Sequence, residues 1–301
     1  KVIEADKKAG KEPMTFAMVF PVSTHNYELR YWLASAGIDP DKDIRLIVIP
    51  PPQMVANLQS KNIVGYCVGE PWNQRAVELG IGHALVTDYE IWKNNPEKVF
   101  GVNLEWAEKY PNTHKATIKA LIEAAMWADK AENRKEVVQI ISAKSYVNAP
   151  PDVVDNSMTG TWRYNKVEAP QPMPDFNVFY RYAANYPWLS HAAWYITQMY
   201  RWGQLDKPLD IRKTAASIYR PDIYRAVAKE MGIPCPTGDW KTEGMNKGPW
   251  TLKAATQPIP MGPDTFFDGM TYDPGKLMAY LKGFKVSNAK VDMAALAKLN
   301  R

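Results

Sequence analysis

Two stretches, Phe20-Pro-Val-Ser-Thr-His25 and Cys67-Val-Gly-Glu-Pro-Trp72, decide how this chain is interpreted. Each one ends a short apolar run typical of a strand and opens an amphipathic run typical of a helix. Each therefore directs the backbone N–H groups of a new helix into one region, where they favour a negative charge. The two stretches together predict a site for a small anion, without catalytic machinery.

Apolar and amphipathic runs alternate on both sides of these stretches. Helices are expected to begin near His25, after Pro50-Pro-Pro52 and at Pro71, where a proline in the first turn costs nothing. Strands are expected before and between these helices, at residues 14–20, 46–49, 63–68 and 83–87. Strands that alternate with helices at this spacing predict an α/β lobe with a mostly parallel sheet.

The pattern changes after about Ile91, where helix signals dominate and strand signals are nearly absent. Helices are expected at residues 110–130, 132–142, 175–186, 190–205, 211–217 and 221–231, and a loop that wraps over a surface at residues 233–275. Helices without a sheet need another surface to pack on, and we expect that surface upstream of Lys1. We therefore expect three parts: a remnant or linker at residues 1–13, an α/β lobe at 14–90, and a helical return segment with a C-terminal wrap at 91–301.

The composition excludes several kinds of protein. The chain has 301 residues, of which 46% are hydrophobic, and a net charge of +5, which suits one large domain or two lobes. Basic and acidic residues alternate along the chain, so we expect no nucleic-acid partner. Cys67, Cys235 and the scattered histidines have no metal-binding spacing, so we expect neither a metal nor another cofactor. No run of about 18 apolar residues occurs, so no membrane span is expected.

Several motifs resemble those of the nitrate- and bicarbonate-binding proteins of ABC uptake systems. The most specific are Pro50-Pro-Pro-Gln-Met-Val-Ala-Asn57 and Cys67-Val-Gly-Glu-Pro-Trp-Asn73. The others are Phe20-Pro-Val-Ser-Thr-His-Asn26, Leu29-Arg-Tyr-Trp-Leu33, Gly37-Ile-Asp-Pro-Asp41, Pro96-Glu-Lys98, Ser190-His191, Arg201-Trp-Gly203 and Thr265-Phe-Phe-Asp-Gly269. The resemblance covers nearly the whole chain. It implies an α/β fold of the type II periplasmic-binding-protein class, with two lobes and a hinge. In that family the chain visits lobe one, lobe two and lobe one again, so we expect an N-terminally truncated chain that lacks the first pass through lobe one.

The same resemblance implies that His25, Gly69 and Lys98 contact the ligand, with Thr24 and Glu70 beside them. The chemistry agrees with nitrate, which accepts hydrogen bonds and donates none. His25 would add an imidazole donor at a helix start, Gly69 would let an oxygen approach its backbone N–H, and Lys98 would supply a positive charge. Glu70 would lie next to the anion and orient His25. Each residue also has a structural interpretation: a histidine in a local cap, a glycine in a turn and a lysine on the surface.

The expected function is that of a solute-binding protein that captures nitrate or nitrite for uptake by an ABC transporter. Its partners would be the anion and the permease and ATPase complex. Its location would be the periplasm or the outer face of the cytoplasmic membrane. The chain shows no nucleophile set, acid–base pair or phosphate-binding loop, so an enzyme is not expected. A bicarbonate-binding member of the family and a cytoplasmic nitrate or nitrite sensor are alternatives. Nitrate is favoured because Lys98 is a cation, whereas bicarbonate gains from a buried acceptor or a bound calcium.

Overall fold

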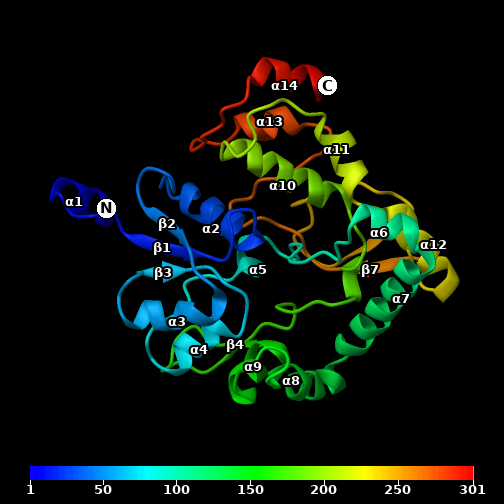
Figure 1. Cartoon of the computed structure of the whole chain (residues 1–301), viewed down its shortest axis with the longest axis horizontal. Helices are drawn as coiled ribbons and strands as arrows, with labels where there is room; N and C mark the ends of the chain where they lie inside the picture. The colour runs from blue at the N-terminus through cyan, green and yellow to red at the C-terminus, as the bar shows by residue number, and fades with distance from the viewer. Residues whose placement is uncertain (301) are drawn as a thin grey trace. The chain divides into compact units, whose positions relative to one another are not determined.

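The computed structural model describes residues 1–300 and contains two compact units (Figure 1). Unit 1 comprises Lys1–Ile91, Arg134–Asn177 and Lys285–Ser287, and unit 2 comprises Trp92–Asn133, Val178–Phe284 and the described residues from Asn288 onward. The chain first crosses from unit 1 to unit 2 at Ile91–Trp92. Residues 134–177, which we expected in the return segment, lie in unit 1 instead.

Unit 1 contains a three-stranded parallel sheet in the order β2-β1-β3. The strands are β1 (Thr15–Met18), β2 (Arg45–Val48) and β3 (Gly65–Tyr66), and each is followed by a helix: α2 (Thr24–Ser35), α3 (Pro51–Gln59) and α4 (Trp72–Glu78). The expected alternation and parallel pairing are therefore confirmed. The expected strand at residues 83–87 is wrong, because this segment stays outside the sheet and the Ala84 N–H donates to the Tyr164 carbonyl.

The helices of unit 1 cover both faces of this sheet (Figure 1). Phe16 packs with Leu29 and Leu33 of α2, whereas its neighbour Ala17 packs with Met54 of α3. Successive strand residues point to opposite faces, so a single short strand serves two apolar layers. The sheet is thereby sandwiched, and its carboxyl-terminal edge is held between rigid helices.

The remaining elements of unit 1 explain why residues 134–177 belong to it. They are α1 (Val2–Lys8), α5 (Asp88–Ile91), α8 (Arg134–Ser142), α9 (Pro151–Met158) and the antiparallel pair β4 (Thr161–Trp162) and β5 (Gln171–Pro172). Helix α9 packs on both α8 and α4. The Asn156 side chain of α9 donates to the Gln74 side chain of α4, and Gln74 donates to the Arg163 carbonyl. A buried amide thus joins the two parts of the unit.

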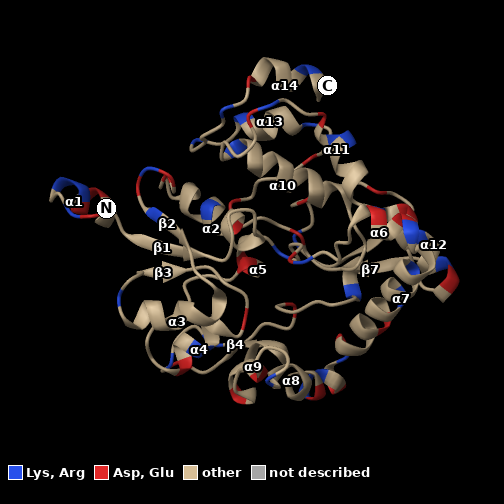
Figure 2. Ribbon diagram, in the orientation of Figure 1, with Lys and Arg blue, Asp and Glu red and all other residues tan. Residues whose placement is uncertain are grey.

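Unit 2 is mainly helical. Its helices are α6 (Leu104–Lys109), α7 (Pro111–Ala128), η1 (Ala131–Asn133), η2 (Arg181–Ala183), α10 (Leu189–Arg201), α11 (Ile211–Ile218), α12 (Pro221–Met231), α13 (Leu277–Lys282) and α14 (Met293–Leu299). The antiparallel strands β6 (Trp250–Leu252) and β7 (Ile259–Met261) lie within the segment expected to be a loop. Within residues 1–300, no helix combines the length and apolar character that a membrane crossing requires. Basic and acidic residues are interspersed in both units (Figure 2).

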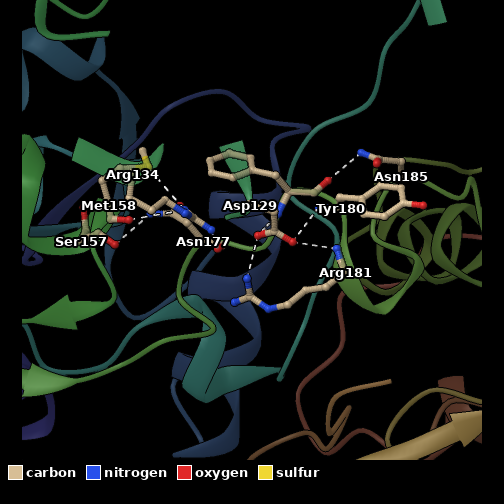
Figure 3. A network of polar contacts seen from close by, with 9 residues as sticks. Asp129, Arg134, Ser157, Met158, Asn177, Tyr180, Arg181 and Asn185 are labelled. Atoms are coloured by element: carbon tan, nitrogen blue, oxygen red, sulfur yellow. Dashed lines mark hydrogen bonds and ion pairs between the residues drawn. The ribbon is translucent and has the colours of Figure 1, made fainter. Parts of the chain in front are cut away.

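The helix expected at residues 175–186 is wrong, and the reason is a carboxylate. Asp129 accepts the backbone N–H groups of Phe179, Tyr180 and Arg181 at 3.2, 3.1 and 2.7 Å (Figure 3). Tyr182 has a φ of 63°, which a right-handed helix does not allow. Only the short helix η2 forms, because the donors of a longer helix already bind an acceptor from α7's C-terminal end.

Candidate functional site

Unit 1 brings His25 and Gly69 together at the carboxyl-terminal edge of its sheet. His25 is the second residue of α2, which follows β1, and Gly69 follows β3, the neighbour of β1. A Cβ placed on Gly69 would lie 3.5 Å from Nε2 of His25, which is an ordinary van der Waals contact. The imidazole and the glycine backbone are therefore adjacent. This edge of a parallel sheet is where open α/β folds bind their ligands.

The start of α2 is built to favour a negative charge. Ser23 is the N-cap, and its side chain accepts the Asn26 N–H at 3.2 Å. Thr24 and His25 then form the first turn, where the helix dipole favours an anion. His25 is 5% exposed, so its ring is held by packing. The predicted neighbour Thr24 lies in this turn, directly before His25.

Glu70 is fixed to α4, behind Gly69. It accepts hydrogen bonds from the Asn73 side chain at 2.8 Å and from the Gln74 N–H at 3.2 Å. We expected Glu70 to orient His25, but both hydrogen bonds go to α4. Burial raises the pKa of Glu70 to about 7, although the two hydrogen bonds oppose this shift. Near neutral pH the carboxyl is therefore partly protonated, which reduces the negative charge beside Gly69.

Lys98 belongs to unit 2 and lies in an irregular segment that follows Trp92. The side chain is 75% exposed and forms an ion pair with the neighbouring Glu97. The Tyr195 hydroxyl of α10 donates to the Pro96 carbonyl at 2.7 Å, which anchors the segment two residues before Lys98. An exposed ion pair of this kind contributes little to stability, so the ammonium is available to another anion at small cost.

An acidic pair beside the site, the buried Glu28 and the partly exposed Asp88, was not predicted from the sequence. Glu28 lies one turn after His25 in α2 and is 1% exposed. Asp88 opens α5, which packs on α2, and the Cys67 thiol lies 3.4 Å from its Oδ1. One available signal was spacing, because residues three apart share a helix face. The other was a glutamate placed directly between Tyr27 and Leu29.

Two further polar networks, one in each unit, fix the backbone close to residues 133–134 and 177–178, where the chain passes from one unit to the other (Figure 3). In unit 2, the Arg181 guanidinium donates to Asp129 at 2.7 Å. In unit 1, Arg134 donates to the Asn177 carbonyl at 2.8 Å, and the Asn177 side chain donates to the Ser157 carbonyl at 3.1 Å. These contacts fix backbone positions and contain no nucleophile or acid–base pair. They support the fold and are not part of the anion site.

Comparison with known proteins gives consistent matches. Residues 1–142 match the NMT1-like family. The chain is 37% identical over 272 residues to the nitrate import ATP-binding protein NrtC of Synechocystis sp., a match covering 90% of this chain and 38% of that protein. It is 35% identical over 284 residues to the nitrate/nitrite binding protein NrtA of Nostoc sp., covering 93% of this chain and 60% of that protein. The chain thus spans less than two thirds of the length of either relative.

A solved structure matches the fold. The crystal structure of the periplasmic nitrate-binding protein NrtA from Synechocystis PCC 6803 superposes with a TM-score of 0.83 and 32% sequence identity. The match covers 95% of this chain and 69% of that one. The expected α/β fold of a type II periplasmic binding protein is thereby confirmed.

Proposed function

Because the chain belongs to the family of the periplasmic nitrate-binding protein, we propose that it is the binding part of a protein that captures nitrate or nitrite. The observation that carries the proposal is the adjacency of His25 and Gly69 at the start of α2. An imidazole donor, a glycine backbone N–H and a helix dipole meet there. A planar anion that only accepts hydrogen bonds fits this set.

Lys98 supplies the positive charge in this proposal. Nitrate carries one negative charge, and a site with neutral donors alone would leave that charge uncompensated when water is removed. The Lys98 ammonium is exposed within unit 2 and forms an ion pair with Glu97. We assign it to the ligand, together with His25 and Gly69, while Thr24 and Glu70 support those contacts from the adjoining helix starts.

The protein performs no reaction in this proposal. It delivers the anion to the permease and ATPase of an ABC transporter, from the periplasm or from the outer face of the cytoplasmic membrane. The names of the relatives support this assignment, since they include an import ATP-binding protein and a periplasmic binding protein. A bicarbonate-binding member of the family and a cytoplasmic nitrate or nitrite sensor are the alternatives that the test must separate.

One observation favours a second candidate. The match to the import ATP-binding protein covers 90% of this chain but 38% of that protein, so part of that protein resembles most of this chain. In this second reading, the same anion site regulates an attached ATPase instead of delivering the anion. The complete reading frame decides between them, because a nucleotide-binding domain in the same polypeptide supports regulation.

Isothermal titration of the full-length protein tests the ligand. Nitrate, nitrite and bicarbonate are compared, the last with and without calcium. We expect nitrate to bind and His25→Ala to weaken binding by about tenfold or more, because a hydrogen bond to a charged partner is lost. His83→Ala changes an exposed histidine of the same unit and should match the wild type. Binding of bicarbonate without any binding of nitrate would overturn the proposed ligand.

A further inference from the structure

The Glu28 carboxyl is buried without full hydrogen bonding, one helical turn from His25. Its exposed fraction is 1%, and within the described residues Oε1 is buried with no hydrogen-bond partner. A buried carboxylate with an unsatisfied oxygen is unfavourable, and such groups retain a proton instead. Burial first, and then the charge of Asp88, raise the pKa of Glu28 well above its ordinary value. The neutral acid is therefore the favoured form.

The second carboxyl, Asp88, connects this position to the other half of the site. The Cys67 thiol donates to Asp88 Oδ1 at 3.4 Å, and Cys67 precedes Gly69 by two residues. Helix α5, which carries Asp88, packs against α2, which carries Glu28 and His25. The acidic pair thus lies against both elements that form the anion site.

Building on the proposed function, we propose that protonation of Glu28 controls anion affinity. As a neutral acid Glu28 permits an anion at His25 and Gly69, and as a carboxylate it repels that anion. Residues three apart on a helix are neighbours, about 5–6 Å between Cβ atoms. A new negative charge one helical turn from the imidazole that donates to the anion, in a partly buried site, should weaken the binding of a monovalent anion by about tenfold.

Linkage makes the effect reciprocal. If ionisation of Glu28 weakens anion binding, then a bound anion must favour protonation of Glu28 by the same factor. Over the pH range in which Glu28 titrates, the anion is therefore bound together with a proton. The Glu28 carboxyl holds that proton, and no bond to the ligand forms or breaks.

Other groups near Glu28 also titrate or carry charge. Helix α5 contributes an aspartate, and the segment after β3 contributes a cysteine and a glutamate. Helix α2 itself contributes a histidine, and an arginine that forms an ion pair with Asp41. They are Asp88, Cys67, Glu70, His25 and Arg30. Protonation of His25 or Glu70 also favours an anion, so a fall in affinity with rising pH does not by itself identify Glu28. The experiment must separate their contributions.

Nitrate affinity is measured by isothermal titration of the full-length protein at a series of pH values rising from about 6. Glu28→Gln keeps the side-chain shape and removes the charge, and Glu70→Gln does the same at the neighbouring carboxyl. We expect the nitrate affinity of the wild type to fall by about tenfold or more as pH rises. The affinity of Glu28→Gln should fall clearly less. The affinity of Glu70→Gln should still show the part of the fall that ionisation of Glu28 causes. Glu78→Gln, at the exposed end of α4, is the matched control and should follow the wild type.

A second measurement uses the wild type, in case Glu28→Gln does not fold. Carbon-13 NMR follows the Glu28 carboxyl carbon during a pH titration, and we expect nitrate to move its midpoint upward. An unchanged midpoint, or a Glu28→Gln variant with the pH slope of the wild type, overturns the role of Glu28 while nitrate binding stands. A wild type that binds no nitrate at any pH removes the proposed function, and the inference falls with it.

Discussion

Each unit buries a glutamate almost completely, and the two carboxyls behave in opposite ways. Glu28 in unit 1 and Glu243 in unit 2 are each 1% exposed. The pKa of Glu28 is raised well above its ordinary value, whereas that of Glu243 is lowered to about 2. Burial is the same in both cases, so the difference comes from the partners of each carboxyl.

Glu243 is surrounded by donors. The Ser190 hydroxyl donates to it at 2.6 Å, Lys241 forms an ion pair with it, and Nε2 of His191 lies 3.4 Å away. Burial alone would raise the pKa of Glu243, but the Lys241 ammonium, together with the nearby His191 ring, outweighs it. Glu28 has Asp88 as its charged neighbour instead. A fully paired buried carboxylate fits a structural role, whereas an incompletely paired one fits a role in function.

The largest expected effect tests the structural side of this comparison. Lys241→Met leaves Glu243 buried without its main cation, so we expect the free energy of unfolding to fall by ~3–5 kcal/mol. Urea unfolding at neutral pH measures it. Lys247→Met, in an exposed position of the same segment, should change stability by less than about 0.5 kcal/mol. Equal effects of the two variants would contradict the assignment.

The pH dependence of stability should have opposite signs in the two units. The folded-state pKa of Glu243, about 2, lies below its ordinary value of 4.5, so its ~3 kcal/mol contribution is present above about pH 4.5 and lost as pH falls towards 2. The folded-state pKa of Glu70, about 7, lies above 4.5, so its contribution is present below about pH 4.5 and lost as pH rises through 7.

Hydrogen exchange resolved by unit, measured across this pH range, separates the two effects. Lys241→Met should reduce the acid-side loss in unit 2. Glu70→Gln should remove its own part of the loss in unit 1 at rising pH, while the part due to Glu28 remains. If both units lose stability only on acidification, the assignment for Glu70 is wrong.

Lys98→Ala separates binding from stability. Lys98 is exposed and pairs with its neighbour Glu97, so its removal should leave the free energy of unfolding nearly unchanged. Loss of the cation should weaken nitrate binding by more than about tenfold. Titration with nitrate measures the effect, and Lys93→Ala is a control within the same segment. An unchanged affinity would remove Lys98 from the site.

The smallest expected effect is the change in stability caused by Glu28→Gln, which tests the functional side of the comparison. Glu28→Gln removes a carboxyl that already favours its neutral form, so the free energy of unfolding near pH 6 should change by less than about 1 kcal/mol. Urea unfolding measures it beside Lys241→Met. A loss as large as that of Lys241→Met would mean that Glu28, like Glu243, is a structural group.

Much of the local structure was predictable from particular residues. Ser23 is a typical N-cap residue and lies at the start of α2. Pro51 and Pro52 lie in the first turn of α3, where proline is favoured. Trp188, Trp194 and Trp202 are buried, as their large apolar rings favour. The helix prediction at residues 175–186 was wrong because a side chain distant in the sequence binds that backbone. Asp129 takes the N–H groups that a helix at residues 175–186 would need, and no local pattern encodes a partner about 50 positions away.

The site shows the same division. His25 and Gly69 were predicted from their motifs, and the structure places them next to each other. Glu28 was missed, because its importance depends on Asp88, 60 positions later in the chain. The alternation of strands and helices, the caps and the two helix starts were determined by the sequence itself, since hydrogen bonding and side-chain period act over a few residues. Only the tertiary structure decided which buried carboxyls keep a proton, because that depends on which charges and donors the fold packs around each one.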